Sequence, residues 1–224
     1  MAPVLGYWNI RGLAQPIRLM LAYTETKYED KRYVYGPPPD FDRRDWLGEK
    51  LELGLDFPNL PYYIDGNTKL TQSITIMRYL ARKLELDPTT EEERIRADLV
   101  EQQTADFRMA LTRICYSADF ENLKTEYLKT LPTHFKNFSA FLGNRKWLAS
   151  ADKLTYVDFM LYEAIDHNRI LEPDCLKHFP TLKAFMERFE ELPTIKKYME
   201  SDDFIKYPLN GDMAAFGSRL SKKK

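Results

Sequence analysis

The chain has 224 residues, with 33 Lys or Arg against 34 Asp or Glu, so its formal net charge is −1 at pH 7. This length allows one large domain or two smaller ones with a proper core. The balanced charge argues against a nucleic-acid-binding protein, because the only basic run is the short Lys222–Lys224 tail.

Cysteine use and hydropathy narrow the class further. The two cysteines, Cys115 and Cys175, have no CxxC spacing, so neither a disulfide framework nor a zinc or thioredoxin-type redox motif is expected. No apolar run is long enough for a signal peptide or a membrane span. We therefore expect a reduced, cytoplasmic protein with no membrane partner.

The first fifty residues predict a β-α-β unit followed by a short helix. Val4–Trp8 is typical of a buried strand, and Pro16 suits the first turn of a helix. Lys27–Tyr35 predicts a second strand, and three consecutive prolines then require a loop. Arg43–Leu51 predicts a short helix.

The next stretch combines a strand, a tight turn and a helix start. Pro58 and Pro61 hold the intervening backbone extended, and Tyr62–Ile64 favours a strand. Asp65–Asn67 is a turn into a return strand, and Ser73 opens a helix. A helix N-terminus favours a carboxylate or phosphate, although on this stretch alone a plain packing unit is the simpler interpretation. The element order is that of a thioredoxin-like sheet.

The second half predicts helices only. Asp87-Pro88 breaks the preceding helix, and Thr90 with Glu93 forms a capping box, so we place a domain boundary there. The predicted domains are residues 1–84, thioredoxin-like, and residues 90–224, all-helical. Apolar periodicity predicts helices over residues 95–114, 128–142 and 182–189, and a central buried helix after the second capping signal, Thr155 to Asp158.

No common catalytic motif is present, but three clusters meet at one edge of the expected sheet. The histidines match no metal-ligand spacing, and GxSxG, P-loop and GxGxxG motifs are missing. The clusters are Tyr7-Trp8, then Arg43, Trp46 and Lys50, then Asn59-Leu60 with Gln72-Ser73. Such a set suits a small extended ligand with terminal carboxylates and peptide bonds between them.

The sequence resembles the mu class of cytosolic glutathione S-transferases. The resemblance is carried by GYWNIRGLAQPIRL from Gly6, PDFDRRDW from Pro39, GLDFPNLPYYIDG from Gly54, LTQSITIMRYLARK from Leu70, EEERIRAD from Glu91 and TYVDF from Thr155. It implies a thioredoxin-like N-terminal domain and an all-α C-terminal domain. It also implies conjugation of the thiolate of reduced glutathione to hydrophobic electrophiles, in detoxification, by a homodimer that needs no metal or other cofactor.

The resemblance assigns a glutathione site. Tyr7 would donate a hydrogen bond to the glutathione sulfur, which favours the thiolate over a thiol whose pKa is about 8.5 in water. Leu60 would pair with the cysteinyl backbone, with its bond to Pro61 cis. Gln72 and Ser73 would hold the γ-glutamyl carboxylate at the helix N-terminus. The remaining contacts would come from Trp8, Arg43, Trp46, Lys50 and Asn59, and from Asp106 reaching the glutathione of the neighbouring subunit.

The resemblance also assigns an electrophile site and a dimer contact. Tyr116 would hydrogen-bond the electrophile as negative charge builds. The pocket would be lined by Ile10, Leu13, Thr112 and Leu209. Thr112, Arg113 and the tail YPLNGDMAAF are less apolar than the pattern expected there. Phe57 would fill a pocket on the partner subunit, with Arg78 and Asp98 near the dimer axis.

Two rival interpretations share this fold. One is a carrier of apolar ligands that does not depend on catalysis, and the other is a structural protein built on a transferase scaffold. The presence of Tyr7, Gln72-Ser73 and Tyr116 argues against the structural protein, which has no use for them. Fold alone does not choose between the others.

Overall fold

The computed structural model describes residues 2–221, so the Lys222–Lys224 tail lies outside the described part. Its strands are β1 (Val4–Trp8), β2 (Glu29–Tyr33), β3 (Tyr62–Asp65) and β4 (Thr68–Thr71). They form one sheet in the order β2-β1-β3-β4, in which β1 and β2 are parallel and the other two pairs are antiparallel.

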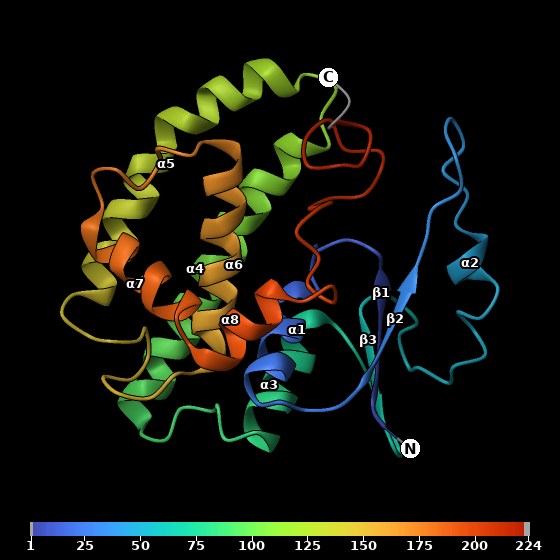
Figure 1. Ribbon diagram of the computed structural model, residues 1–224, viewed down its shortest axis with the longest axis horizontal. Helices are drawn as coiled ribbons and strands as arrows, with labels where there is room; N and C mark the ends of the chain where they lie inside the picture. Colours follow the sequence, from blue (N-terminus) through green and yellow to red (C-terminus); the bar gives the residue numbers. More distant parts are fainter. Residues whose placement is uncertain (1, 222–224) are drawn as a thin grey trace.

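The helices lie in two groups. They are α1 (Gln15–Tyr23), α2 (Arg44–Leu47), α3 (Ser73–Lys83), α4 (Glu91–Cys115), α5 (Phe120–Leu142), α6 (Tyr156–Leu171), α7 (Pro180–Glu190) and α8 (Pro193–Glu200). In Figure 1 the sheet and α2 lie on one side and α4 to α8 on the other, with α1 and α3 between them. The parallel β1 and β2 are joined through α1, as a parallel pair requires a crossover connection.

Several predicted boundaries differ from the observed ones. The second strand and the short helix after it are both shorter than predicted. The fifth helix begins at Phe120, eight residues before the apolar pattern that predicted it. Helix α8 was not predicted, because the last helix that apolar periodicity indicated ends at residue 189. In fact Pro193 opens α8, where a proline is well suited since its missing N–H has no partner in a first turn.

Both predicted capping boxes are present. Thr90 accepts a hydrogen bond from the N–H of Glu93 at 3.2 Å, and the Glu93 carboxylate returns to the N–H of Thr90 at 3.2 Å. Asp158 accepts from the N–H and the hydroxyl of Thr155 at 2.8 and 2.9 Å. Each box satisfies N–H groups that have no partner within the helix.

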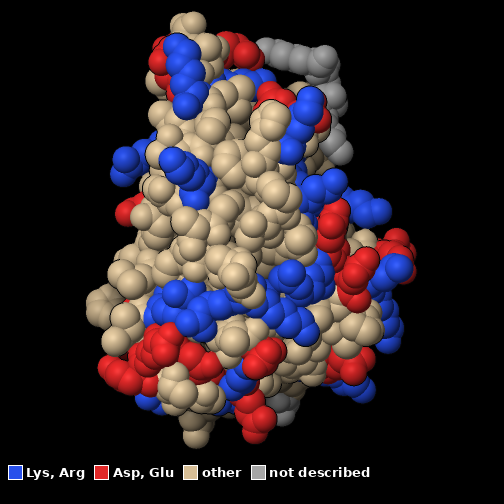
Figure 2. Space-filling model, turned by 90° about the vertical axis from the view of Figure 1, so that its left-hand side faces the viewer, with Lys and Arg blue, Asp and Glu red and all other residues tan. Residues whose placement is uncertain are grey.

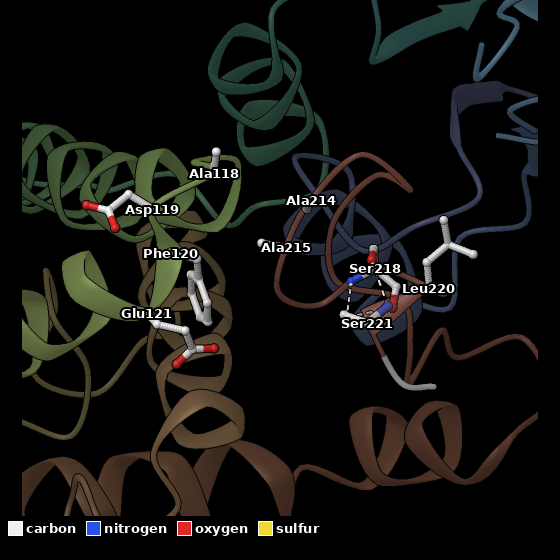
Figure 3. Close-up of a pocket in the computed structure, with 9 residues that line it drawn as sticks. All are labelled: Ala118, Asp119, Phe120, Glu121, Ala214, Ala215, Ser218, Leu220 and Ser221. Atoms are coloured by element: carbon white, nitrogen blue, oxygen red, sulfur yellow. Dashed lines mark hydrogen bonds between the residues drawn. The ribbon is translucent and has the colours of Figure 1, made fainter. Parts of the chain in front are cut away.

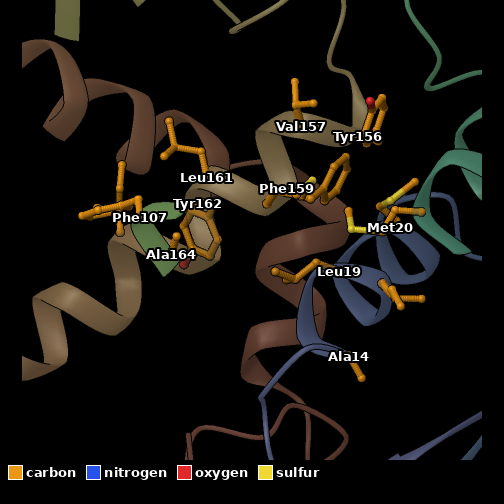
Figure 4. Packing of buried hydrophobic residues seen from close by; sticks show 14 of the residues in the cluster. Ala14, Leu19, Met20, Phe107, Tyr156, Val157, Phe159, Leu161, Tyr162 and Ala164 are labelled. Atoms are coloured by element: carbon orange, nitrogen blue, oxygen red, sulfur yellow. The ribbon is translucent and has the colours of Figure 1, made fainter. Parts of the chain in front are cut away.

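Helix α6 is the central helix, as its apolar composition predicted. Thirteen of its 16 residues are buried. Helix α1 packs against it, and Figure 4 shows Leu19 and Met20 of α1 beside Phe159 of α6. This packing joins the sheet-bearing half of the molecule to the helical half through apolar side chains.

The apolar face predicted for α4 is only partly buried. Val100, Phe107 and Leu111 lie in the core, whereas Ile95 and Leu99 are exposed. Exposed apolar residues that extend a buried face are typical of a contact surface. Apolar periodicity therefore predicted the helix, but it did not show which of its apolar residues lie in the core.

Charges of both signs occur on the helical side of the molecule. Figure 2 shows basic residues in a band beside acidic ones, next to a broad area that carries neither. Within residues 2–221, no helix is long and apolar enough to cross a membrane.

Candidate active site

Tyr7 lies in β1 with only 7% of its surface exposed. Its hydroxyl oxygen accepts a hydrogen bond of 3.1 Å from the backbone N–H of Leu13. Because the oxygen accepts from the backbone, the phenol proton is left to donate to another group. A Cβ at Gly12 would lie 2.6 Å from that oxygen, and Gly12 has φ +43°, so this close approach requires glycine.

Strand register brings the predicted clusters to one edge of the sheet. Trp8 at the end of β1 pairs with Tyr33 at the end of β2. Tyr62, which follows Leu60-Pro61, pairs with Thr71, which precedes Gln72. Since Gly6 pairs with Tyr62, the chain before β3 and the chain after β4 both continue beside the Tyr7 end of β1. The expected meeting of the Tyr7-Trp8 segment with the segments at Leu60 and Gln72 is confirmed.

The Leu60–Pro61 peptide bond is cis, as the family resemblance implied. The N–H of Leu60 donates to Oδ1 of Asn59 at 2.9 Å. A ligand that accepts from the Leu60 backbone must therefore displace the Asn59 carboxamide. Asn59 itself is exposed, so this side chain has room to move into solvent.

The start of α3 has the features of an anion site. No side chain caps the helix, and its first turn contains no acidic residue. Gln72 at the N-cap has φ 70°, an unfavourable conformation for a residue other than glycine that costs about 1–3 kcal/mol. Backbone strain of this kind is concentrated at binding sites, and the positive end of the helix favours a carboxylate at Gln72 and Ser73.

Aromatic packing connects α2 to the same sheet edge. The buried Trp46 ring stacks on Tyr62 at 6.0 Å between centroids and meets Tyr33 edge-on at 5.3 Å. Trp8 stacks on Tyr35 at 4.1 Å. Trp46 thus fixes α2 against the sheet, and Tyr35 is a residue of this edge that the sequence did not single out.

The other predicted charged residues are accessible. Arg43 is exposed and Lys50 is half-buried. Asp106 is exposed on α4.

Tyr116 lies at the C-cap of α4, 43% exposed. Its hydroxyl oxygen accepts a 2.7 Å hydrogen bond from the N–H of Gly211 in the C-terminal tail. Burial raises the pKa of Tyr116 against the opposing effect of that N–H, so the phenol stays a donor at neutral pH. The tail is held on α4 by a second bond, from the N–H of Ala215 to the carbonyl of Cys115 at 2.8 Å.

The residues expected to line the electrophile pocket differ in accessibility. Leu13 is exposed, whereas Ile10 and Leu209 are buried. Thr112 is half-buried, and its hydroxyl donates to the carbonyl of Arg108 at 2.9 Å. The hydroxyl of Thr112 is therefore satisfied within its own helix, which reduces the polarity it brings to a pocket.

Leu13 and Ser73 line one cavity of about 170 Å³ between α1, α3, α4 and α6. Thr104 and Arg108 line it too, and sequence reasoning missed both. The Thr104 hydroxyl and the Arg108 Nε are buried without a hydrogen-bond partner among the described residues. The mostly apolar walls and two unpartnered donors suit an organic ligand with an acceptor group.

The sequence of this chain is similar to those of known proteins over nearly its whole length. Residues 3–82 match the model of the glutathione S-transferase N-terminal domain, and residues 105–202 match that of the C-terminal domain. The chain is 56% identical to glutathione S-transferase Mu 3 of Macaca fuscata fuscata, covering 96% of each chain. It is 55% identical to Mu 1 of Mus musculus, covering 98% of this chain and all of the other. The chain belongs to the glutathione S-transferase family, in its mu class.

Solved structures support the same fold. The glutathione S-transferase Blo t 8 superposes with a TM-score of 0.89 at 35% identity, over 96% of this chain and 99% of that one. A pi-class transferase of Onchocerca volvulus gives 0.84 at 35% identity, over 96% and 100%. The predicted fold, a thioredoxin-like part followed by a helical part, is confirmed.

Arg11 is a further residue of this mu-class chain that sequence reasoning left without a role. It is 2% exposed and donates to Glu163 at 2.9 and 2.6 Å and to Asp166 at 2.6 Å. Burial opposes ionisation of Glu163, but Arg11 and His167 outweigh it and hold the pKa of Glu163 at about 2. Arg11 lies within GYWNIRG, yet nothing in that motif indicates a buried partner 152 residues away.

Other groups capable of chemistry lie outside this site. Burial raises the pKa of Cys115 to about 12 and that of Cys175 to about 11, so both thiols stay protonated at neutral pH. Among residues 2–221 no three His, Cys, Asp or Glu side chains are grouped as a metal site needs. A surface cavity of about 370 Å³ separates the start of α5, at Phe120, from the tail at Ser218, as Figure 3 shows.

Proposed function

We propose that this protein is a glutathione transferase that adds the thiolate of reduced glutathione to hydrophobic electrophiles. The observation that carries this function is the hydroxyl of Tyr7, which is fixed by the Leu13 N–H beside an uncapped helix N-terminus. Family membership supports the same reaction. In a cell the product would be a detoxified conjugate, and the cytoplasm is the proposed location.

We infer that the nucleophile is the thiol of a co-substrate and not a cysteine of the chain. Its own thiols, Cys115 and Cys175, are protonated at neutral pH, and the thiolate is the reactive form. A phenol titrates near 10 in water, so a tyrosine remains a hydrogen-bond donor at pH 7. The bond from Tyr7 to the glutathione sulfur favours the charged form and raises the reactive fraction. The mechanism uses no metal and no covalent enzyme intermediate.

The remaining residues would bind glutathione along the sheet edge. The γ-glutamyl carboxylate would lie at Gln72 and Ser73, where the α3 N-terminus attracts negative charge. The backbone of Leu60 would pair with the cysteinyl unit once the Asn59 carboxamide is displaced. The other proposed contacts are Trp8, Arg43, Trp46, Lys50 and, from the neighbouring subunit, Asp106.

The electrophile would lie between the Tyr7 loop and the tail. Tyr116 would donate to the group on which negative charge builds, a role that its position at the C-cap of α4 permits. Ile10, Leu13, Thr112 and Leu209 are the residues proposed to surround it. Positioning of the thiolate and the electrophile together would supply much of the rate enhancement.

The active form proposed is a homodimer. Phe57 is 76% exposed on a loop, which is unfavourable for an isolated chain. Elsewhere the chain has a cavity of about 220 Å³ lined by Leu99, Val100, Gln103, Asn137, Phe138 and Phe141. We propose that Phe57 of each subunit enters this cavity of the other. Arg78, which binds Glu101 at 2.7 Å and Asp98 at 3.4 Å, would lie near the axis.

Retention on immobilised glutathione, followed by assays with several electrophiles, tests the proposal. A transferase is retained and converts at least one electrophile faster than free glutathione does. Retention without turnover indicates the carrier, and lack of retention indicates the structural protein. Domain boundaries at residues 84 and 90 are tested separately, by limited proteolysis between Lys83 and Glu91, where α3 ends and α4 begins.

A further inference from the structure

Arg11 connects the turn that carries Leu13 to the central helix α6. Its guanidinium makes three hydrogen bonds of 2.6–2.9 Å to Glu163 and Asp166, and Glu163 is itself 1% exposed. A bidentate pair between arginine and a buried carboxylate fixes both distance and orientation. The turn at residues 9–13 is therefore anchored to the helical half of the molecule.

The backbone of the same turn is anchored to the C-terminal tail. The N–H of Arg11 donates to the carbonyl of Pro208, and the N–H of Gly12 donates to the carbonyl of Leu209, both at 3.0 Å. The turn thus has fixed contacts on two sides before it reaches Leu13. Leu13 then donates its N–H to the hydroxyl oxygen of Tyr7.

We propose that Arg11 is a positioning residue that, through the turn at residues 9–13, holds the Leu13 N–H on Tyr7 and so aims the Tyr7 proton at the glutathione sulfur. This role rests on the proposed function. When the turn shifts, the Leu13 N–H leaves the phenol oxygen, and the phenol rotates more freely. A less directed donor stabilises the thiolate less, so the pKa of the bound thiol rises.

The charge of Arg11 does not itself account for thiolate formation. Glu163 and Asp166 of α6 neutralise the guanidinium at hydrogen-bond distance. The other ionisable groups facing this cluster are His167 of α6, whose pKa is lowered by burial against the effect of Glu163, and two arginines, Arg108 of α4 and Arg169 of α6. Arg169 donates to Asp166 at 2.6 Å and also pairs with Glu190, and Arg11 pairs with Glu163 and Asp166, so neither arginine is an isolated positive charge and the effect of Arg11 on Tyr7 is geometric.

The ionisable groups that face Tyr7 come from other elements. Tyr35, after β2, and Tyr116, at the end of α4, both interact electrostatically with Tyr7, and Arg43 acts on Tyr35. None of them contacts Arg11 in the described hydrogen bonds or ion pairs. Arg11 also lies over the Phe204 ring, 5.7 Å from its centroid. Substitution of Arg11 therefore changes its contacts with Glu163, Asp166 and Phe204, but removes no direct interaction of Tyr35 or Tyr116 with Tyr7.

The test compares three variants of the full chain. Arg11→Lys keeps the charge but loses the bidentate geometry. The double variant Arg11→Met with Glu163→Gln removes the arginine and its buried partner together, while Asp166 keeps its ion pair with Arg169, so that no unpaired carboxylate stays buried. Arg96→Met is the matched control, because Arg96 also holds buried structure, donating to the carbonyls of Phe141 and Leu148, and it does not touch the turn.

Two quantities are measured on each variant: the pKa of enzyme-bound glutathione from thiolate absorbance, and the hydrogen-exchange rate of the Leu13 amide. We expect both Arg11 variants to raise the pKa of the bound thiol by about half a unit or more. A change of this size corresponds to the free energy lost when one hydrogen bond is partly broken. The Leu13 amide should exchange faster in both. The Arg96→Met variant should match the wild type in both quantities.

Two results would overturn the inference. In the first, Arg11→Lys folds and leaves both the thiol pKa and the Leu13 exchange rate unchanged. In the second, Arg96→Met raises the thiol pKa and the Leu13 exchange rate as much as the Arg11 variants do, since general destabilisation then explains the changes. If the double variant does not fold, Arg11→Lys decides. If wild-type protein shows no thiolate from bound glutathione, the proposed function fails, while Leu13 exchange still tests the anchoring by Arg11.

Discussion

Tyr7 and Tyr116 present their hydroxyl groups in the same manner on different supports. Each oxygen accepts a backbone N–H, from Leu13 at 3.1 Å and from Gly211 at 2.7 Å. Tyr7 lies in a strand and is buried, whereas Tyr116 lies at a helix end and is exposed. In both cases the backbone occupies the phenol oxygen and leaves the proton for a ligand.

The difference lies in what holds the two donors. Leu13 follows a turn that a buried arginine fixes to α6, while Gly211 belongs to a tail without regular secondary structure. The tail is buried at Leu209 and hydrogen-bonded to Gly217, and it also accepts the N–H groups of Arg11 and Gly12. Both phenols therefore depend on the tail, and the Tyr7 turn differs in having a second, ion-paired anchor in α6.

Replacing Tyr7 by Phe should produce the largest change. It removes the proposed hydrogen bond to the sulfur, and a bond to a charged group is worth roughly 1.5–3 kcal/mol, so conjugation at pH 7 should fall by about ten- to a hundredfold. Retention on immobilised glutathione should persist, because the contacts of the carboxylates remain. Unchanged conjugation of an aryl halide would show that Tyr7 does not have the assigned role.

The anchor beneath the Tyr7 turn should be sensitive to acid. The pKa of Glu163 is about 2 in the folded chain, below the ordinary value of 4.5, so its ion pair stabilises the fold above pH 4.5. That stability is lost as the pH falls from 4.5 towards 2. Between pH 5 and pH 3 the wild type should lose about 2 kcal/mol more unfolding free energy than Glu163→Gln. Urea denaturation measures this, and equal losses would contradict the assignment.

Gly12 and Gly66 give a matched pair of substitutions. Both have positive φ, but a Cβ at Gly12 meets the Tyr7 ring and hydroxyl, whereas a Cβ at Gly66 meets nothing within 4 Å. Gly12→Ala should lower conjugation by about tenfold or more, because a small misplacement of the donor is costly. Gly66→Ala should cost only about 1 kcal/mol of stability. Equal activity of the two variants would mean that contact with Tyr7 is unimportant.

Replacing Tyr116 by Phe should have the smallest and most selective effect. We expect a fall of about three- to tenfold for electrophiles that build negative charge on an oxygen, such as unsaturated ketones. Retention on glutathione should be unchanged. A loss that is the same for every electrophile would indicate that Tyr116 supports the fold and not the reaction.

The sequence predicted the sheet edge because its signals are local. Strand composition, the prolines around Leu60 and the start of the helix at Ser73 each depend on neighbouring residues, and the register of the strands then brought them together. Family resemblance supplied the roles that we propose for Tyr7 and Tyr116, which spacing alone does not indicate. The cis bond at Leu60–Pro61 also came from the resemblance.

Contacts between residues far apart in the sequence could not be predicted from local sequence signals. Arg11 and Glu163 are 152 residues apart, and a single charged residue in a turn gives no sign of a buried partner. The exposure of Ile95 and Leu99 on α4 was not predictable either, because an apolar stripe has the same periodicity whether or not the chain buries it. Helix α8 was missed because a proline ends one helix as readily as it starts another.

The most direct test of the central claim is the ionisation of glutathione bound to three proteins, followed by thiolate absorbance against pH. The wild type should ionise the thiol at least about one unit below the value near 8.5 of a free thiol. Tyr7→Phe should return the pKa towards the free value, and Tyr116→Phe should leave it at the wild-type value. Equal pKa values for wild type and Tyr7→Phe, or an equal rise in Tyr116→Phe, would contradict the division of work between the two tyrosines.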